Sequence, residues 1–191
     1  MIKIAIKDMV DMVAIDGIQG GTGAAPEVVL ENIGIPSLAA IVQAIDGVVE
    51  MGRRDEITLM LMGGIKDGVD AAKAMALGAD AVAIGTAAIL AGTCIACVQC
   101  HSNKCPTGIT THKPDLESRY DIDRNAEWIA TFLRNMANEV SAITLALGKD
   151  DCHSLRRDDL RALTPEASAI TGIPTLDSGA IYDPDYLRRE G

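Results

Sequence analysis

Ile57-Thr58-Leu59-Met60-Leu61-Met62-Gly63-Gly64-Ile65-Lys66-Asp67-Gly68 is the stretch that decides the fold. It begins with an apolar run that stops at a pair of glycines. A short apolar run bounded by turn residues predicts a strand of a parallel sheet, buried on both faces. The turn then leads into residues 67–77, which predict a helix ending at Gly78. The stretch is therefore a strand joined to a helix, the repeating unit of α/β proteins.

Two further apolar runs flank this unit, Met12–Ile15 and Ala81–Ile84, and each is followed by a glycine-bearing turn. Between the first and second runs, residues 36–51 predict a helix with Ser37 as its N-cap. The apolar positions that predict its buried face are Leu38, Ile41, Val42, Ile45 and Val49. The alternation of strands and helices predicts three parallel strands in βαβ units. A closed eight-stranded barrel needs ~250 residues, so we expect a small open sheet or the C-terminal part of something larger.

Helices are also predicted outside the sheet. Residues 2–9 are interpreted as a helix, and residues 125–147 as one long amphipathic helix that Gly148 ends. Its core-facing stripe is predicted to be Trp128, Phe132, Met136, Val140 and Ile143. A short helix over 154–163 and a loosely ordered tail complete the expectation.

Composition narrows the classes of function. The 191 residues carry a net charge of −10, which disfavours binding to nucleic acid and to anionic membranes. No apolar run reaches the ~18 residues of a membrane span, and the first residues lack a signal-peptide pattern. We therefore expect a cytoplasmic protein with no nucleic-acid or membrane partner. In that compartment clustered cysteines are metal ligands or redox groups more often than disulfides.

Four of the five cysteines, Cys94, Cys97, Cys100 and Cys105, follow the third predicted strand. Their spacing is C-x2-C-x2-C-x4-C, and Pro106 comes next. Zinc modules usually separate two C-x2-C pairs by a longer spacer. The run is closer to the bacterial ferredoxin pattern and favours an iron–sulfur cluster. Zinc, or unligated redox thiols, are the alternatives.

Glycine-bearing turns after the second and third predicted strands form the other chemical motif. Gly63, Gly64 and Gly68 follow one strand, and Gly85-Thr86 follows the next. Glycines let backbone N–H groups approach a phosphate. Two such turns on neighbouring strands predict the phosphate grip common in barrels, against the alternative of two ordinary turns. The longer glycine-rich loop at residues 17–26 places Gln19 and Thr22 where they could face a ligand, unless it is a plain surface loop.

These motifs together resemble the FMN-binding barrel of glutamate synthases of the archaeal and bacterial type. The loop at 16–26, the segments 62–68 and 84–88, and the cysteine run 94–108 occur in that family's order. The resemblance covers roughly residues 1–150. It implies that the chain is the C-terminal part of a (β/α)8 TIM barrel, followed by an Fe–S cysteine loop and C-terminal helices. It divides the chain into a partial FMN-binding barrel (1–92), a cluster loop (93–110) and a helical extension with a tail (111–191).

The resemblance also implies an activity. In that family electrons pass from an Fe–S cluster to FMN and reduce 2-iminoglutarate, formed from 2-oxoglutarate and glutamine-derived ammonia, to L-glutamate. Carried onto this chain, Gln19 and Thr22 would face the substrate, and the four cysteines would hold a [3Fe–4S] or [4Fe–4S] cluster. The fourth thiolate, Cys97, departs from the three ligands of many members. The positions implied to bind FMN are Gly20, Gly21, Gly63, Gly64, Asp67, Gly68, Gly85 and Thr86.

A second departure is larger, because the family's earlier barrel strands have no counterpart here. The active-site lysine of the family cannot be assigned to Lys3 or Lys7. We therefore expect the chain to act in an oligomer or complex, with the missing barrel half, a glutaminase and an electron-donor subunit that uses ferredoxin or NAD(P)H. Two alternatives are a non-catalytic electron-transfer or assembly module and another FMN-dependent barrel oxidoreductase, including a relative of inosine-monophosphate dehydrogenase.

Overall fold

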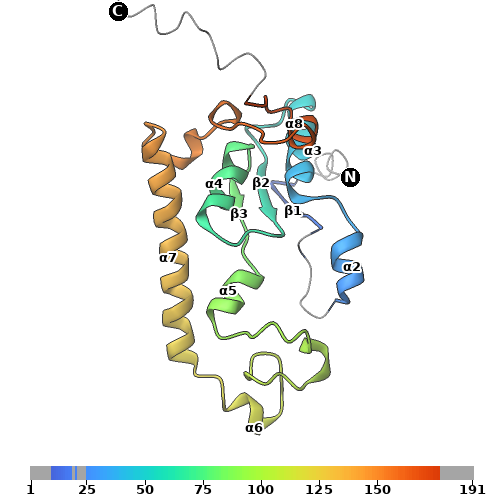
Figure 1. Ribbon diagram of the computed structural model, residues 1–191, viewed down its shortest axis with the longest axis vertical. Coiled ribbons are helices and arrows are strands. Elements are labelled where there is room, and N and C mark those ends of the chain that lie inside the picture. The colour runs from blue at the N-terminus through green and yellow to red at the C-terminus, as the bar shows by residue number, and fades with distance from the viewer. Residues whose placement is uncertain (1–9, 19, 21–24, 177–191) are drawn as a thin grey trace, which may run out of the picture.

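The structure is a computed structural model, and it describes residues 10–18, 20 and 25–176. Its centre is a parallel sheet of three strands in the order β1-β2-β3 (Figure 1). The strands are β1 (Met12–Asp16), β2 (Thr58–Met62) and β3 (Ala81–Val82). Met12 pairs with Thr58 and Met60 with Ala81. The predicted α/β class is confirmed, although β3 ends two residues before the predicted Ile84.

Two helices cover one face of the sheet. Helix α3 (Ser37–Glu50) and helix α4 (Gly68–Ala76) pack their apolar side chains against alternate residues of β2. Leu59 and Leu61 point to this side, and both are fully buried. The other members of this core come mainly from the two helices and include Ile41, Ala44, Val48, Ala74 and Leu77. Every second residue of β2 therefore packs against the apolar faces of the two helices, as the sequence predicts.

Details of α3 differ from the prediction. Pro36 is the N-cap, and Ser37 is the first helical residue. The buried arc is centred on Ile41 and Val48, so that Leu38 and Val49 lie beside it with 46% and 55% of their surface exposed. The Ser37 hydroxyl is not used as a cap but donates a hydrogen bond to the Gly63 carbonyl at 2.7 Å.

The predicted end of α4 at Gly78 is confirmed. Gly78 has a φ of +112°, its N–H bonds the Met75 carbonyl, and the Ala79 N–H bonds the Ala74 carbonyl. This pair of bonds is the Schellman motif, which favours glycine at that position.

Few of the described residues cover the opposite face of the sheet. Met12 is 53% exposed, and Ala14 and Asp16 are exposed on the same side of β1. Met60 and Met62 continue this side on β2 and are half-buried. Parallel sheets are normally covered on both faces, and this side of the sheet, called the open face below, differs from that rule across the described residues.

Helix α7 (Ile122–Ala146) confirms the long predicted helix, and Gly148 follows it with a φ of +71°. It runs along α4 and α5 (Thr86–Ala91), as Figure 1 shows. Met136 is buried as predicted. The prediction that Trp128 lies in the core is wrong, because 45% of its surface is exposed. The Arg124 guanidinium lies over the Trp128 ring, with its Cζ atom 5.1 Å from the ring centre. The contact face of α7 includes Asn125 and Met136, and Trp128 falls outside it.

The predicted helix over 154–163 is wrong. The chain there forms two 3-10 turns, Cys152–Ser154 and Arg157–Asp159, and the α-helix comes later as α8 (Pro165–Thr171). Local side-chain bonds to the backbone compete with helix formation in this segment. Asp159 accepts a bond from the Arg156 N–H at 2.7 Å. Thr164 caps α8, and Pro165 is its first residue.

The short helices α2 (Glu27–Asn32) and α6 (Pro114–Glu117) and the 3-10 turn Cys100–Ser102 complete the secondary structure of the described part. The predicted helix at 2–9 and the tail after residue 176 lie outside the described residues. Across residues 10–18, 20 and 25–176, none of the helices has the length and apolar content that a bilayer crossing requires.

Replacing Asp159 with asparagine should lower the free energy of unfolding by about 1 kcal/mol near neutral pH. The Lys149 ammonium hydrogen-bonds the Asp159 carboxylate, and together with the Arg156 N–H this lowers the pKa of Asp159 despite its burial. A lowered folded pKa gives stability that is present above the unfolded value of about 3.9 and is lost as the pH falls through the folded value. Urea unfolding should therefore show the difference from wild type at pH ~7 and its disappearance in acid.

The exposed neighbour Asp158 provides the matched control, since Asp158→Asn removes the same charge from the same turn. We expect that variant to unfold close to wild type at both pH values. A constant difference for Asp159→Asn down to the acid limit would contradict the ion-pair account.

Candidate functional site

Backbone hydrogen bonds shape the turn after β1 and join it to the end of β2. The Gly17 N–H donates to the Met62 carbonyl at 3.1 Å, and the Gly20 N–H donates to the Gly17 carbonyl at 2.8 Å. Gly63 has a φ of +93°, and a Cβ there would lie 2.9 Å from the Gly20 nitrogen. Only glycine therefore fits at Gly63, and its absent side chain lets the two turns meet.

A cavity of about 370 Å³ opens at this junction, at the carboxyl ends of the strands. Its wall includes five of the residues predicted to bind FMN: Gly20, Gly63, Gly64, Gly85 and Thr86. We call it the glycine cavity. Concave sites at the carboxyl ends of parallel strands are the usual ligand sites of α/β folds.

Lys66 also lines the glycine cavity, and the sequence analysis did not single it out. Its ammonium group donates to Asp70 at 2.7 Å, and this hydrogen bond raises the pKa of Lys66. The group is thus a cation at neutral pH. Glycine backbone N–H groups with a nearby ammonium group are suited to a phosphate ester, so the wall fits the phosphate end of a flavin mononucleotide.

Asp67 and Gly68 do not line the glycine cavity. Asp67 is the N-cap of α4, and the N–H of Asp70, at 2.9 Å, lowers the pKa of its carboxyl. Gly68 donates its N–H to the Glu139 carboxylate of α7 at 2.7 Å. A Cβ at Gly68 would lie 2.4 Å from the Met136 carbonyl, so this glycine allows α4 and α7 to pack closely.

The four clustered cysteines line a second cavity of about 820 Å³, which we call the cysteine cavity. Cys105 is buried, and Cys94, Cys97 and Cys100 are half-buried. Apolar residues, among them Ile89, Leu90 and Ile109, make much of the remaining wall. The predicted ligands therefore lie around a common space with an apolar lining.

The backbone of the cysteine loop is unusual. Thr93, Ala96, Val98 and Asn103 all have positive φ angles, between 52° and 75°. This conformation is unfavourable for β-branched residues such as Thr93 and Val98, and strained backbone gathers at functional sites. It turns the Ala96 N–H toward the Cys94 sulfur at 3.4 Å.

Cys105 is prepared to act as a thiolate. Burial raises the pKa of its thiol, but hydrogen bonds from the side chains and backbone N–H groups of Thr107 and Thr110 outweigh burial and lower the pKa to about 6. The Thr107 hydroxyl lies 3.4 Å from the sulfur. Metal ligation requires the thiolate, so four thiols around one cavity, one of them already acidic, fit an iron–sulfur cluster.

The two cavities share part of their walls. Gly20, Gly85, Thr86 and Leu90 line both. The stretch from Gly85 to Cys94 thus joins the end of β3, the helix α5 and the first cysteine in one short path. Gln19, Gly21 and Thr22, which belong to the predicted substrate and flavin sides, lie outside the described residues.

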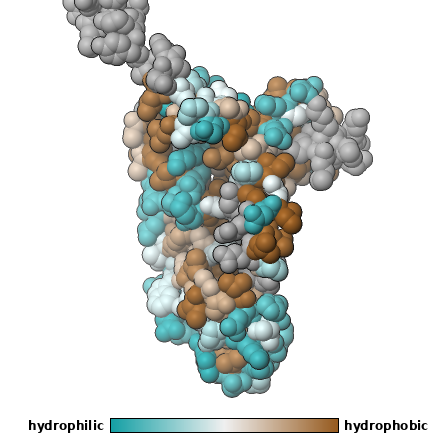
Figure 2. Space-filling view, turned by 45° about the vertical axis from the view of Figure 1, so that its right-hand side comes forward, coloured by the Kyte–Doolittle hydropathy of each residue, from teal (hydrophilic) through white to brown (hydrophobic). Residues whose placement is uncertain are grey.

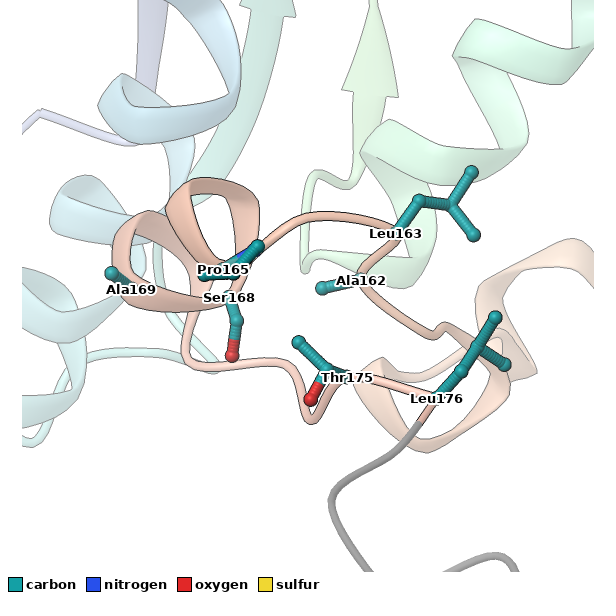
Figure 3. Close-up of a pocket in the computed structure, with 7 residues that line it drawn as sticks. All are labelled: Ala162, Leu163, Pro165, Ser168, Ala169, Thr175 and Leu176. Atoms are coloured by element: carbon teal, nitrogen blue, oxygen red, sulfur yellow. The ribbon is translucent and has the colours of Figure 1, made fainter.

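A third cavity, of about 530 Å³, lies far from this junction, between α8 and the segment that pairs Ala162 with Thr175 (Figure 3). Its wall is made of small and apolar side chains, with the hydroxyl groups of Ser168 and Thr175 as its polar groups. It has no titratable group in its wall, and we assign it no chemical role.

Comparison with known proteins shows a clear family likeness. Residues 1–150 match the family described as the conserved region in glutamate synthase. The chain is 41% identical over 187 residues to a glutamate synthase large subunit-like protein of Rhizobium meliloti, covering 90% of this chain and 42% of that protein. It is 42% identical over 164 residues to the archaeal glutamate synthase (NADPH) of Methanocaldococcus jannaschii, covering 85% of this chain and 32% of that protein.

The chain therefore spans about a third to two fifths of the length of these curated relatives. Among solved structures, a flavocytochrome b2 double variant with sulfite bound matches with a TM-score of 0.49 and 14% identity. That match covers 98% of this chain and 42% of the other.

Proposed function

Because the chain belongs to the family defined by the conserved region in glutamate synthase, we propose that it forms part of an oxidoreductase that makes L-glutamate from 2-oxoglutarate and ammonia released from glutamine. The relatives are named glutamate synthases, and the named activity is NADPH-dependent in the archaeal relative. The observation that carries the proposal is the shared wall between the cysteine cavity and the glycine cavity.

In this proposal the chain contributes two binding sites. Cys94, Cys100 and Cys105, with Cys97 as a fourth candidate, would hold an iron–sulfur cluster. Gly63, Gly64 and Gly85 would hold the FMN phosphate through backbone N–H groups, with the Lys66 ammonium nearby. When bound, the two groups supply electron transfer and reduction of the imine carbon.

The residues themselves would bind, orient and exclude water. Leu90 and the apolar residues of the cysteine loop would exclude water from the space beside the shared wall once the two groups are bound. Thr86 lines both cavities. The tight contact of Gly63 with Gly20 fixes the two turns relative to each other.

We further propose that the open face is covered by additional barrel strands in the working enzyme, as part of a (β/α)8 barrel. Three strands give the flavin site one wall only, and the open face includes the half-buried Met60 and Met62 and the exposed Met12. Apolar side chains also gather around the middle of the face drawn in Figure 2, which α2 borders. Val28 and Val29 of α2 and Ile33, which follows this helix, are exposed, with 40–69% of their surface accessible.

A direct experiment tests the proposal. The chain is reconstituted anaerobically with iron, sulfide and FMN, alone and together with a polypeptide that carries the missing strands of a full-length relative. Each sample is then given 2-oxoglutarate, ammonium and dithionite as the electron donor. We expect iron to bind in both samples, and stoichiometric FMN and glutamate formation only in the second. Glutamate formation by the chain alone would refute the need for cover, and absence of FMN in both samples would refute the flavin site.

A second candidate function is a non-catalytic electron-transfer module. It is favoured by one observation: all four cysteines line one cavity within this chain. A reducible cluster signal in electron paramagnetic resonance, with no flavin bound under either condition above, would favour this function over the enzyme.

A further inference from the structure

Asp151, Cys152 and His153 form a cluster that the proposed function does not use. One carboxylate oxygen, the thiol sulfur and one ring nitrogen all lie within 4.8 Å of one another. The His153 Nδ1 atom lies 3.1 Å from the Asp151 Oδ1 atom and 3.7 Å from the Cys152 sulfur. Cys152 is half-buried, and the other two side chains are exposed.

The ring of His153 is held from its far side. Its Nε2 lies 3.2 Å from the backbone carbonyl oxygen of Asp80. In the tautomer that donates from Nε2 to this carbonyl, Nδ1 holds the lone pair that binds a metal ion. Metal-bound histidines are commonly held in this way, with the second ring N–H donating to a carbonyl.

The lone pair of Nδ1 points at groups that also accept. A carboxylate oxygen 3.1 Å away cannot donate to it, so either a proton or a cation must lie between them. The thiol beside the same nitrogen favours the cation, because it adds a third ligand atom to the nitrogen and the carboxylate oxygen.

The spacing of the three atoms suits one small ion. On a tetrahedral zinc with bonds of about 2.0–2.3 Å, nitrogen and oxygen lie about 3.4 Å apart and nitrogen and sulfur about 3.6 Å apart. The distances of 3.1 Å and 3.7 Å are close to these values. Little movement is needed to bring the three atoms onto a common ion.

We propose that Asp151, Cys152 and His153 form a binding site for a zinc-class divalent cation, with three protein ligands and an open fourth position. The 3-10 turn that carries them is held by Leu155, which is buried against Ala72 and Ala76 of α4. The ion would join this turn, through His153, to the residue that precedes β3.

The site lies at the other end of the molecule from the two cavities. Asp80 comes just before β3, at the amino ends of the strands, whereas the cavities lie at the carboxyl ends. Figure 1 shows the turn after α7 at the top and the cysteine loop at the bottom. The proposal is therefore independent of the proposed function, and its expected role is to stabilise or regulate the fold.

Cobalt(II) is the probe that tests this site, because a thiolate ligand gives it a charge-transfer absorption band. The full chain is first reconstituted with iron and sulfide, so that the loop cysteines are occupied, and Co²⁺ is then titrated into wild type and Cys152→Ser. We expect wild type to bind one equivalent of Co²⁺ more than Cys152→Ser does. The bound Co²⁺ should show a thiolate charge-transfer band that disappears when Zn²⁺ displaces the ion. Zn²⁺ should also raise the melting temperature of wild type and leave that of Cys152→Ser unchanged.

Controls separate a lost ligand from a lost fold. Cys152→Ala tests the same ligand with a different side chain, His153→Ala removes a second ligand, and His112→Ala removes an exposed histidine elsewhere and should bind like wild type. Circular dichroism verifies that each variant folds. Equal cobalt binding and equal spectra in wild type and both Cys152 variants would overturn the proposal, as would cobalt bound without a thiolate band.

Discussion

The variant Cys105→Ser is expected to lose nearly all of its iron, with a fall of ~10-fold or more relative to wild type, since removing even a supporting group of a metal ligand costs that much. Cys105 is the most buried of the four clustered thiols, and its pKa of about 6 makes it the best prepared ligand. Serine keeps the size of the side chain but offers no thiolate. Iron and acid-labile sulfide per chain, with the visible absorption spectrum, measure the effect after anaerobic reconstitution.

The matched control is Cys152→Ser, which removes the one cysteine outside the loop and should keep the full iron content. Unchanged iron in Cys105→Ser would show that the cysteine cavity does not hold the cluster. Cys97→Ser asks a narrower question: it should lose iron only if the cluster has four iron atoms. A four-iron spectrum retained in Cys97→Ser would refute ligation by Cys97.

Gly63→Ala should both destabilise the chain and prevent FMN binding. Its φ of +93° costs a residue with a Cβ about 1–2 kcal/mol. The new methyl group would also lie 2.9–3.0 Å from backbone atoms of Gly20 and Gly17, and such overpacking adds about 1–3 kcal/mol. Relief requires the turns after β1 and β2 to separate, which deforms the wall of the glycine cavity. Urea unfolding of the chain measures the loss of stability. FMN fluorescence titration of the chain in complex with the polypeptide that carries the missing strands measures the loss of binding.

Gly52→Ala is the control for this prediction. Gly52 also has a positive φ, +65°, but a Cβ there would meet no atom within 4 Å. It should therefore show only the cost of the backbone conformation and bind FMN normally. Equal losses of stability in the two variants would mean that the contact between the turns is unimportant.

The sheet and the helices α3 and α4 that cover it could be predicted because their signals are local. The apolar run at 57–62 must be buried on one face at least, and Gly78 ends α4 by a conformation that glycine adopts most easily. The cysteine spacing likewise predicts a ligand set, because no ordinary loop needs four thiols within twelve residues. The structure gathers these cysteines around one cavity, and their metal stays a prediction.

What could not be predicted depends on distant contacts. Gly68 follows a strand exactly as a phosphate-binding glycine would, yet its N–H is bound by Glu139, 71 residues away in sequence. Trp128 belongs to the apolar pattern of α7, but the helices that cover α7 reach only one side of it. The 154–163 segment has helical composition, and the bonds of Asp159 to Lys149 and to the Arg156 N–H hold it in tight turns instead.

The shared wall of the two cavities has a consequence for how such a chain can evolve. Gly20, Gly85, Thr86 and Leu90 line both cavities, so that one substitution there changes the walls of both. At these positions the wall of one cavity cannot change without a change in the wall of the other. Inherited variation should therefore accumulate at residues that line a single cavity, such as Ile95 or Ile65. Residues of the shared wall should change only together with other residues of both cavities.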